Sequence, residues 1–272
     1  MTLDPTELAQ RLDLARQLAH EAGALLLRHL GRLARYDEKS AIDLVTNADR
    51  ESEAHLAAAL ARAFPQDLRI MEEADGKAGA RARRPLTDAA PYAWCVDPLD
   101  GTTNFVHAYP TFAVSIGLLH YGVPVLGVVH APALRETYSG GVGIPAVCGR
   151  DPIRVSTVPT LSRALLATGF PYDRRERVRE LLAVVERALL GAHDLRRAGS
   201  AALDLCAVAA GRIDGFFEEG LSPWDVAAGQ AIVEAAGGRV TDYTQHAHDP
   251  YGGHILASNG LLHGELAQLV RP

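Results

Sequence analysis

The 272-residue sequence has little cysteine and almost no lysine. Its cysteines, Cys95, Cys148 and Cys206, lie far apart and form no C-x-x-C pair, which argues against a structural zinc and a disulfide framework. Lysine occurs only at Lys39 and Lys77, and 27 Lys+Arg residues against 33 Asp+Glu give a net charge of −6. Binding of nucleic acid through net positive charge is therefore not expected.

No secretion signal is expected, and the sequence has no long uninterrupted apolar run. Asp4 and Glu7 stand where a signal peptide needs basic residues followed by apolar ones. The uncharged stretch Phe112–Leu134 is broken by glycine and proline, and His120–Val123 reads as a turn between two strands. Since 48% of the residues are hydrophobic, the chain can bury a substantial core. We expect a cytoplasmic protein with no membrane partner.

Apolar periodicity and capping residues predict helices that alternate with short strands. Asp4, Pro5 and Glu7 mark the start of a first helix, whose apolar positions recur at helical spacing from Leu8 to Leu26. Further helices are expected at Asn47–Phe64, Arg177–Leu190, Ala201–Ala210, Pro223–Ala236 and the C-terminus. Strands are expected at Leu68–Met71, Trp94–Val96, Ile153–Val155, Leu165–Thr168, Ile213–Phe217 and Ile255–Ala257. This mixture predicts an α+β fold of packed layers that contains antiparallel sheet.

An internal boundary is expected near residues 155–160. Residues 1–155 would form an N-terminal α+β half with the antiparallel sheet and most of the acidic candidate ligands. Residues 156–272 would form a C-terminal α/β half that carries the substrate pocket and Asp225. The two halves are expected to act as one functional unit.

Acidic residues recur where predicted strands end and predicted helices begin. Glu72 follows one strand, Asp97 and Asp100 follow another, and Asp49 and Asp225 stand near helix starts. Each has an ordinary alternative: a helix-start acid favours the helix dipole, and a strand-end acid is often solvated. If they converge at one sheet edge, carboxylates about 4 Å apart repel by roughly 4 kcal/mol at an effective dielectric near 20. Hard oxygen ligands without histidine or cysteine favour Mg²⁺, Mn²⁺ or Ca²⁺.

A candidate phosphate-binding element lies beside these acids. The stretch from Asp97 to Asn104 runs from a strand toward a helix start, and Gly101 lets the backbone approach a ligand closely. Thr102 and Thr103 add hydroxyl groups. Although Asp, Pro and Gly also make ordinary turns, acids next to a phosphate cradle are what metal-assisted phosphoryl hydrolysis requires.

Taken together, these motifs resemble the inositol monophosphatase family. The resemblance rests on Asp43–Asp49, Glu72-Glu73, Asp97–Asn104, Gly199–Leu205, Pro223–Gly229 and Glu234–Gly238, in register from about Leu8 to Leu269. The sequence departs from the family pattern at Met71, where glycine usually precedes the Glu pair, and in the weakly charged segment Gly140–Pro145.

The resemblance implies a layered α/β/α/β/α sandwich and a lithium-sensitive, Mg²⁺-dependent phosphatase that forms a homodimer. Glu72, Asp97 and the Leu99 carbonyl would hold one ion, and Asp97, Asp100 and Asp225 a second. Thr102 and Asp49 would orient the attacking water. Glu72 would also be catalytic and would face a third, more weakly bound ion. Mn²⁺ could substitute for Mg²⁺. The phosphate would rest on Gly101 and Thr102, and Asp100 and Thr103 would also contact the substrate. The polyol pocket would be lined by Gly199, Ser200, Ala201, Glu218 and Asp225.

Charge balance independently suggests three ions. Glu72, Asp97, Asp100 and Asp225 neutralise two divalent cations, and a phosphate monoester adds up to about two negative charges. A third ion would therefore restore neutrality when the substrate binds.

The expected reaction is hydrolysis of myo-inositol 1-phosphate by in-line attack of a metal-activated water. Fructose 1,6-bisphosphate, histidinol phosphate, NADP and 3′-phosphoadenosine 5′-phosphate are alternative substrates. The alternative of another class is a regulatory scaffold that keeps the fold and binds RNA or a protein.

Overall fold

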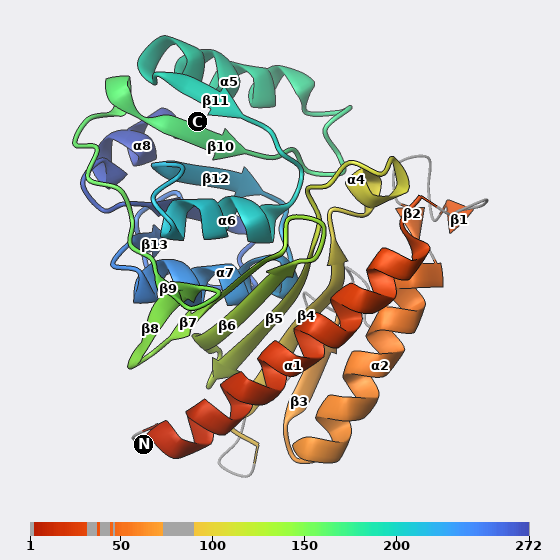
Figure 1. Ribbon diagram of the computed structural model, residues 1–272. Helices are drawn as coiled ribbons and strands as arrows, with labels where there is room; N and C mark the ends of the chain where they lie inside the picture. Colours follow the sequence, from red (N-terminus) through yellow and green to blue (C-terminus); the bar gives the residue numbers. More distant parts are fainter. Residues whose placement is uncertain (1–2, 32–36, 39–43, 46, 73–89, 272) are drawn as a thin grey trace.

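The computed structural model describes residues 3–31, 37–38, 44–45, 47–72 and 90–271. These residues form two large β-sheets with helices packed against them (Figure 1). Two short strands, β1 (Asp37–Glu38) and β2 (Leu44–Val45), pair only with each other. None of the helices in these ranges combines the length and apolarity that a membrane span requires.

The larger sheet has seven strands, and neighbours in the sheet follow one another along the chain. Only β3 and β4 run parallel; the other neighbours are antiparallel. The strands are β3 (Leu68–Met71), β4 (Tyr92–Asp100), β5 (Ala113–His120), β6 (Val123–Ala131), β7 (Glu136–Gly141), β8 (Ile144–Cys148) and β9 (Asp151–Pro152). Tyr121 and Gly122 form the turn from β5 to β6, which confirms the predicted hairpin.

The smaller sheet has five strands in the order β11-β10-β12-β14-β13. Its strands are β10 (Leu165–Thr168), β11 (Asp194–Arg196), β12 (Gly215–Glu219), β13 (Arg239–Thr241) and β14 (His254–Ser258). Strand β10 runs parallel to both β11 and β12, so the ends of these strands point toward the same edge of the sheet.

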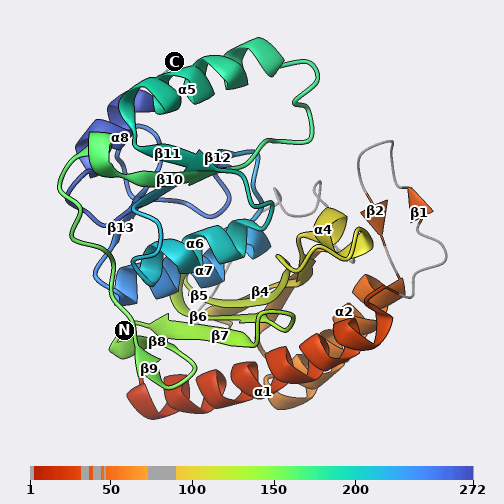
Figure 2. The ribbon, with the colours of Figure 1, turned by 45° about the horizontal axis from the view of Figure 1, so that its top comes forward.

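The helices divide these sheets into layers. They are α1 (Pro5–His29), α2 (Asn47–Ala63), α4 (Thr102–Val106), α5 (Val178–Gly191), α6 (Ala201–Ala209), α7 (Pro223–Ala235) and α8 (His263–Leu269). Figures 1 and 2 show α1 and α2 on one face of the larger sheet, α6 and α7 between the sheets, and α5 and α8 on the outer face of the smaller sheet. This α/β/α/β/α order confirms the predicted fold.

The start of α1 follows its capping residues. The carboxylate of Asp4 accepts a hydrogen bond of 2.8 Å from the Thr6 N–H, and Pro5 occupies the first helical turn. The predicted apolar stripe, which includes Leu8 and Leu26, is buried.

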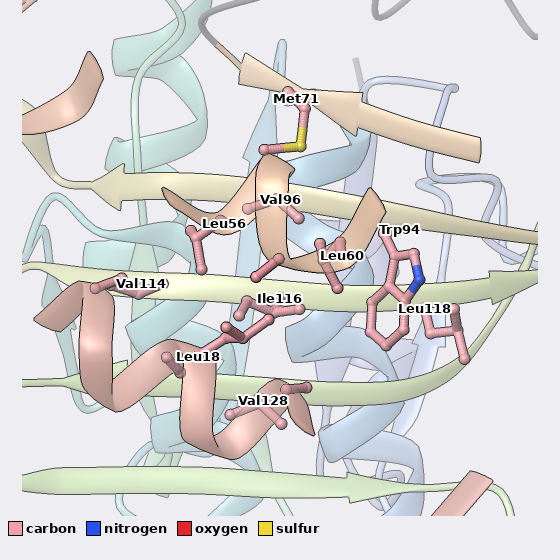
Figure 3. Packing of buried hydrophobic residues seen from close by; sticks show 14 of the residues in the cluster. Leu18, Leu56, Leu60, Met71, Trp94, Val96, Val114, Ile116, Leu118 and Val128 are labelled. Carbon is pink, nitrogen blue, oxygen red and sulfur yellow. The ribbon is translucent and has the colours of Figure 1, made fainter. Parts of the chain in front are cut away.

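The outer core of the larger sheet lies between its strands and the two N-terminal helices. Figure 3 shows Leu18, Leu56 and Leu60 from these helices packed over the strand residues Val96 and Ile116. All five side chains have at most 2% of their surface exposed. Truncation of such a leucine to alanine costs about 2–5 kcal/mol, so this layer contributes strongly to the stability of the sheet that carries the acids.

Helix α7 lies unusually close to the opposite face of the same sheet. A Cβ added at Gly127 would be 2.1 Å from the carbonyl oxygen of Ala228, and one at Gly117 would be 2.7 Å from Ala227 Cβ. The hydroxyl of Ser115 donates a 3.1 Å hydrogen bond to the carbonyl of Trp224 in the first turn of α7. These contacts set the position of that turn relative to β5 and β6.

The structure corrects the prediction of a strand at Ile153–Val155. The backbone N–H of Ile153 donates to Ala146 and that of Val155 to Ala236, so the segment bonds to two different elements and extends no ladder. The short strand β9 ends just before it. The apolar alternation of Ile153 and Val155 instead reflects packing of the connection against the inner core.

Two further differences concern strand length and number. Strand β4 is longer than Trp94–Val96 and includes Asp97 and Asp100 themselves. The glycine-rich segment after Gly140 forms part of β7 and β8, while β11 and β13 have no counterpart among the predicted strands. Both are three-residue strands, too short for a periodic pattern to reveal.

Candidate active site

The end of β4 presents two acids because its pairing is irregular. Asp97 lies opposite Ser115 and Asp100 opposite Ala113, with a bulge between the two acids. The N–H of Leu99 donates 2.9 Å to the Asp97 carboxylate, and the Thr102 hydroxyl donates 3.0 Å to the Leu99 carbonyl. The chain thus turns back on itself while both carboxylates stay at the sheet edge.

Gly101 makes the sharp change from β4 to α4. Its φ of 92° lies in the left-handed region, and a Cβ there would be 2.9 Å from the Thr111 carbonyl oxygen. The Asn104 amide holds this turn from the other side, donating to Thr111 at 2.7 Å and to Ala198 at 2.9 Å. Glycine at 101 is therefore required by both conformation and space.

The third acid comes from the packed turn of α7. Pro223 starts the helix, and the N–H of Ser222 donates 2.6 Å to the Asp225 carboxylate. One carboxylate oxygen each from Asp97, Asp100 and Asp225 lie within 4.8 Å of one another. These three acids, from β4 and α7, therefore converge.

The carboxylates of this cluster destabilise one another in their charged forms. Burial raises the pKa of Asp97 well above its usual range, and the negative charges of Glu72, Asp100 and Asp225 raise it further. Glu72 follows β3, whose Met71 lies opposite Val96, so the chain brings Glu72 beside Asp97. An all-oxygen set of crowded acids fits a hard divalent cation, and these residues could hold one.

Asp100 is oriented by the start of α6. The Ser200 hydroxyl donates 2.5 Å and the Ala202 N–H 2.8 Å to the same Asp100 oxygen. Burial raises the Asp100 pKa to about 6, although these hydrogen bonds and the charge of Arg197 oppose the shift. One oxygen of this acid is thus held by the protein.

The acids lie in a cavity of about 400 Å³ between the two sheets. The predicted residues that line it are Glu72, Asp97, Leu99, Asp100, Gly101, Thr102, Thr103, Gly199, Ala201, Glu218 and Asp225. Ser200 is buried behind Asp100 and Asp49 is buried in the first turn of α2, so neither is among the lining residues. Glu73 lies outside the described residues.

Glu218 forms the wall contributed by the smaller sheet. It stands in β12, and Gly169, just after β10, makes room for it, because a Cβ there would be 2.1 Å from the Glu218 carboxylate. Burial raises the Glu218 pKa, and the nearby charge of Asp204 raises it further. A carboxyl group next to an open volume can exchange hydrogen bonds with ligand hydroxyls.

Several lining residues escaped sequence reasoning. Phe170, Tyr172, Arg174 and Arg197 also line the cavity. Arg197 lies two positions before the Gly199–Leu205 motif, and this proximity could have indicated that Arg197 lines the cavity. The other three belong to a connection with no recognisable pattern.

A layered fold with crowded acids beside a glycine turn suits a metal-dependent phosphoric monoester hydrolase. Comparison with known proteins gives the family: residues 7–272 match the inositol monophosphatase family, and the chain belongs to it.

The chain resembles individual members along nearly its whole length. It is 41% identical to an inositol-1-monophosphatase from Synechocystis over 97% of this chain and 90% of that protein. It is 38% identical to Nus factor SuhB of Escherichia coli over 91% of each chain. The structure of inositol monophosphatase from Anabaena (Nostoc) superposes with a TM-score of 0.84 at 42% identity, covering 97% of this chain and 96% of that one.

Proposed function

We propose that this phosphatase hydrolyses myo-inositol 1-phosphate, or a closely related polyol monophosphate, with Mg²⁺ as its cofactor. The observation that carries the proposal is the joint presence, in one cavity, of the acid cluster around Asp97 and the Glu218 wall. The first suits a phosphate with divalent cations, and the second suits a leaving group rich in hydroxyls.

The roles of the acids follow from their positions. Asp97, at the centre of the cluster, would be shared by two ions, with Glu72 and the Leu99 carbonyl on one side and Asp100 and Asp225 on the other. When bound, such cations lower the pKa of water and neutralise charge on phosphate oxygens. The hydrogen bond from the Ala202 N–H keeps the Asp100 carboxylate in a single orientation. The hydrogen bond from the Ser222 N–H likewise holds the Asp225 carboxylate at the start of α7.

Thr102 is suited to orient the attacking water. Its hydroxyl proton is used in the hydrogen bond to Leu99, so its oxygen lone pairs are left to accept from a water. Asp49, in the first turn of α2, is proposed to complete this role. Ser52, one turn further along α2, donates 3.3 Å to the Pro98 carbonyl, so α2 contacts the same turn of β4.

The phosphate is proposed to rest on Gly101, Thr102 and Thr103. All three residues line the cavity beside the acids, at the start of α4, where backbone N–H groups and hydroxyls can donate to phosphate oxygens. The polyol would lie against Gly199, Ala201 and Glu218, with Ser200 acting through Asp100.

A second candidate is a regulatory scaffold that binds RNA or a protein, favoured by the name Nus factor SuhB of the Escherichia coli relative. The clustered acids have no use in a pure scaffold, which favours catalysis as the primary function. The two roles can coexist in one chain.

The test is phosphate release from inositol 1-phosphate, histidinol phosphate, NADP and 3′-phosphoadenosine 5′-phosphate, with Mg²⁺, with chelator and with lithium. We expect inositol 1-phosphate to be hydrolysed with the highest kcat/KM, and chelator and lithium to abolish turnover. Preference for another monoester by about tenfold or more, equivalent to about 1.4 kcal/mol, would refute the substrate assignment. Absence of Mg²⁺-dependent turnover on every substrate would refute the catalytic proposal.

A further inference from the structure

We propose that a groove at the end of α7 remote from the active site docks a partner protein, which places an arginine side chain against Glu234. The inference is independent of the proposed phosphatase reaction. The groove has a volume of about 380 Å³, and the residues that line it are distinct from those of the acid-containing cavity. Glu234 lies nine residues after Asp225 in α7, which is roughly 14 Å along the helix axis.

The groove is formed by two segments to which the proposed function gives no role. One is the weakly charged segment Gly140–Pro145, which forms the end of β7, the following turn and the start of β8. The other is the C-terminal end of α7, where the Glu234–Gly238 motif begins. A Cβ at Gly140 would be 3.1 Å from Ala235 Cβ, so the strand and the helix are in contact. Figure 1 shows the green strands β7 and β8 beside the blue helix α7.

Apart from Glu234, the groove is lined only by glycine, alanine, valine, isoleucine and proline among the described residues. The apolar surface continues beyond the groove, because Val123 and Val142 expose 60% and 53% of their surface. The Val142 N–H donates 2.9 Å to the Val125 carbonyl, so both exposed valines lie at the same end of the sheet. An exposed apolar surface larger than one side chain is typical of a site that contacts another protein.

Glu234 is the one charged residue among the described residues that line the groove. Within that part of the chain its carboxylate makes no ion pair, and it accepts a 3.0 Å hydrogen bond from Gln230 Nε2. Surrounding protein atoms displace water and raise the Glu234 pKa, against the opposing effect of this hydrogen bond. Since solvent still reaches the side chain, a cationic group of a partner can complement this carboxylate.

Two buried side chains fix the orientation of the Glu234 carboxylate. Gln230 Oε1 can only accept, so His248 Nδ1 donates the 2.7 Å hydrogen bond between them, and Gln230 Nε2 is directed at Glu234. Gln230 and His248 expose only 4% and 9% of their surface. Burial lowers the His248 pKa to about 4, so the ring is neutral at neutral pH. Glu234 Oε1 is therefore held by the protein, and Oε2 is left for a ligand.

Arginine matches the combination of one carboxylate and an apolar wall. Its guanidinium donates paired N–H groups to carboxylate oxygens and is more weakly hydrated than an ammonium group. Its aliphatic stem packs along apolar surface, and arginine is enriched at the centres of protein interfaces. Apolar residues on either side of the arginine would cover Val123 and Val142. The partner segment is therefore an arginine between two apolar residues.

The test compares two tripeptides, acetyl-Leu-Arg-Leu-amide and acetyl-Leu-citrulline-Leu-amide, because citrulline keeps the shape of arginine without its charge. Binding is followed by NMR through the backbone amide signals of Gly141 and Gly143, which line the groove. Butylguanidinium serves as a probe for a lone cation. Phosphate release from inositol 1-phosphate is measured on the same samples.

The variants are Glu234→Gln, which removes the charge, and Val142→Ser, which removes apolar surface from the rim. The matched controls are Glu186→Gln and Val178→Ser, at exposed positions of α5. Because all four positions are exposed and lie outside the active-site cavity, the variants should fold and release phosphate like the parent.

We expect the arginine peptide to bind the parent about fivefold or more tightly than the citrulline peptide, because charge-assisted hydrogen bonds are the stronger ones. Glu234→Gln should remove this difference. Val142→Ser should weaken both peptides by about threefold, as expected for the loss of buried apolar surface. The control variants should bind both peptides like the parent.

Equal affinity of the parent for the two peptides would overturn the proposal, as would a preference that persists in Glu234→Gln or is lost in the controls. Shifts that avoid Gly141 and Gly143 would place the peptides elsewhere. Butylguanidinium binding as tightly as the arginine peptide would mean that the groove takes a lone cation and no partner protein. A change of oligomeric state in Glu234→Gln, measured by light scattering, would assign the groove to a second copy of this chain instead.

Discussion

Gly127 of β6 lies in direct contact with Ala228 of α7: a side chain at Gly127 would begin 2.1 Å from the Ala228 carbonyl oxygen. Asp225 stands one helical turn before Ala228. The separation of sheet and helix at this glycine therefore sets the distance between Asp225 and the two acids of β4.

Substitution Gly127→Ala should push α7 away from the sheet. We expect the free energy of unfolding to fall by about 1–3 kcal/mol or more, as for an overpacked core. The affinity for Mn²⁺, measured by calorimetry, should also fall, because Asp225 moves away from Asp97 and Asp100. The matched control is Gly264→Ala in α8, where an added Cβ meets no atom within 4 Å. Unchanged Mn²⁺ affinity in a destabilised Gly127→Ala would contradict this coupling.

Asp97→Asn should abolish turnover while leaving the fold intact. The side chain keeps its shape but loses the charge that two ions are proposed to share, so we expect kcat to fall by at least about 10²-fold. In chelator, thermal unfolding should occur at a temperature no lower than in the parent, because burial and neighbouring acids already disfavour this carboxylate. Asp151→Asn, at an exposed position in β9, serves as the control. Near-normal turnover of Asp97→Asn would remove Asp97 from the ligand set.

Buried histidines should make the protein less stable in mild acid. Burial lowers the pKa of His130 from 6.5 to about 4, and the nearby His20 ring, 4.2 Å away between ring centres, adds to the shift. Because the folded state disfavours the proton, this contribution to stability is full above pH 6.5 and is lost as the pH falls toward 4. The shift corresponds to about 3 kcal/mol at most.

We expect denaturant unfolding between pH 7 and pH 4 to show this loss, with a smaller slope in His130→Gln. His248 and His263 have similarly lowered pKa values of about 4, so part of the slope should remain. His193→Gln, at an exposed site, should leave the slope as it is. The prediction is wrong if His130→Gln and the parent lose stability in parallel.

The number of ions should depend on the substrate. Glu72, Asp97, Asp100 and Asp225 balance two divalent cations, and the phosphate calls for one more. We expect calorimetric titration with Mn²⁺ to saturate at two ions per chain without ligand and at three with a non-hydrolysable substrate analogue. Saturation at two with the analogue present would refute the third ion.

Local sequence signals were sufficient for much of the fold. Asp4 and Pro5 mark the start of α1, Pro223 marks that of α7, and Gly122 marks the β5–β6 turn, because each acts on the backbone within a few residues. The prediction of a strand at Ile153–Val155 was wrong because strand pairing does not depend on local residues alone. The apolar pattern indicates that the segment is buried. A strand also needs a neighbouring strand to share backbone hydrogen bonds with, and none of the described segments provides one there.

The sequence also indicated the kind of chemistry. Carboxylates, which bind hard cations such as Mg²⁺, lie next to Gly101 and Thr102, and this combination predicts a phosphate substrate. Which side chains share the cavity was decided by packing alone. Asp225 reaches Asp97 because glycines in the sheet let α7 approach. Arg197 faces the cavity while Arg196 binds Asp194 at the surface. Contacts between residues far apart in the chain depend on how the layers close on one another, and no short stretch of sequence carries that information.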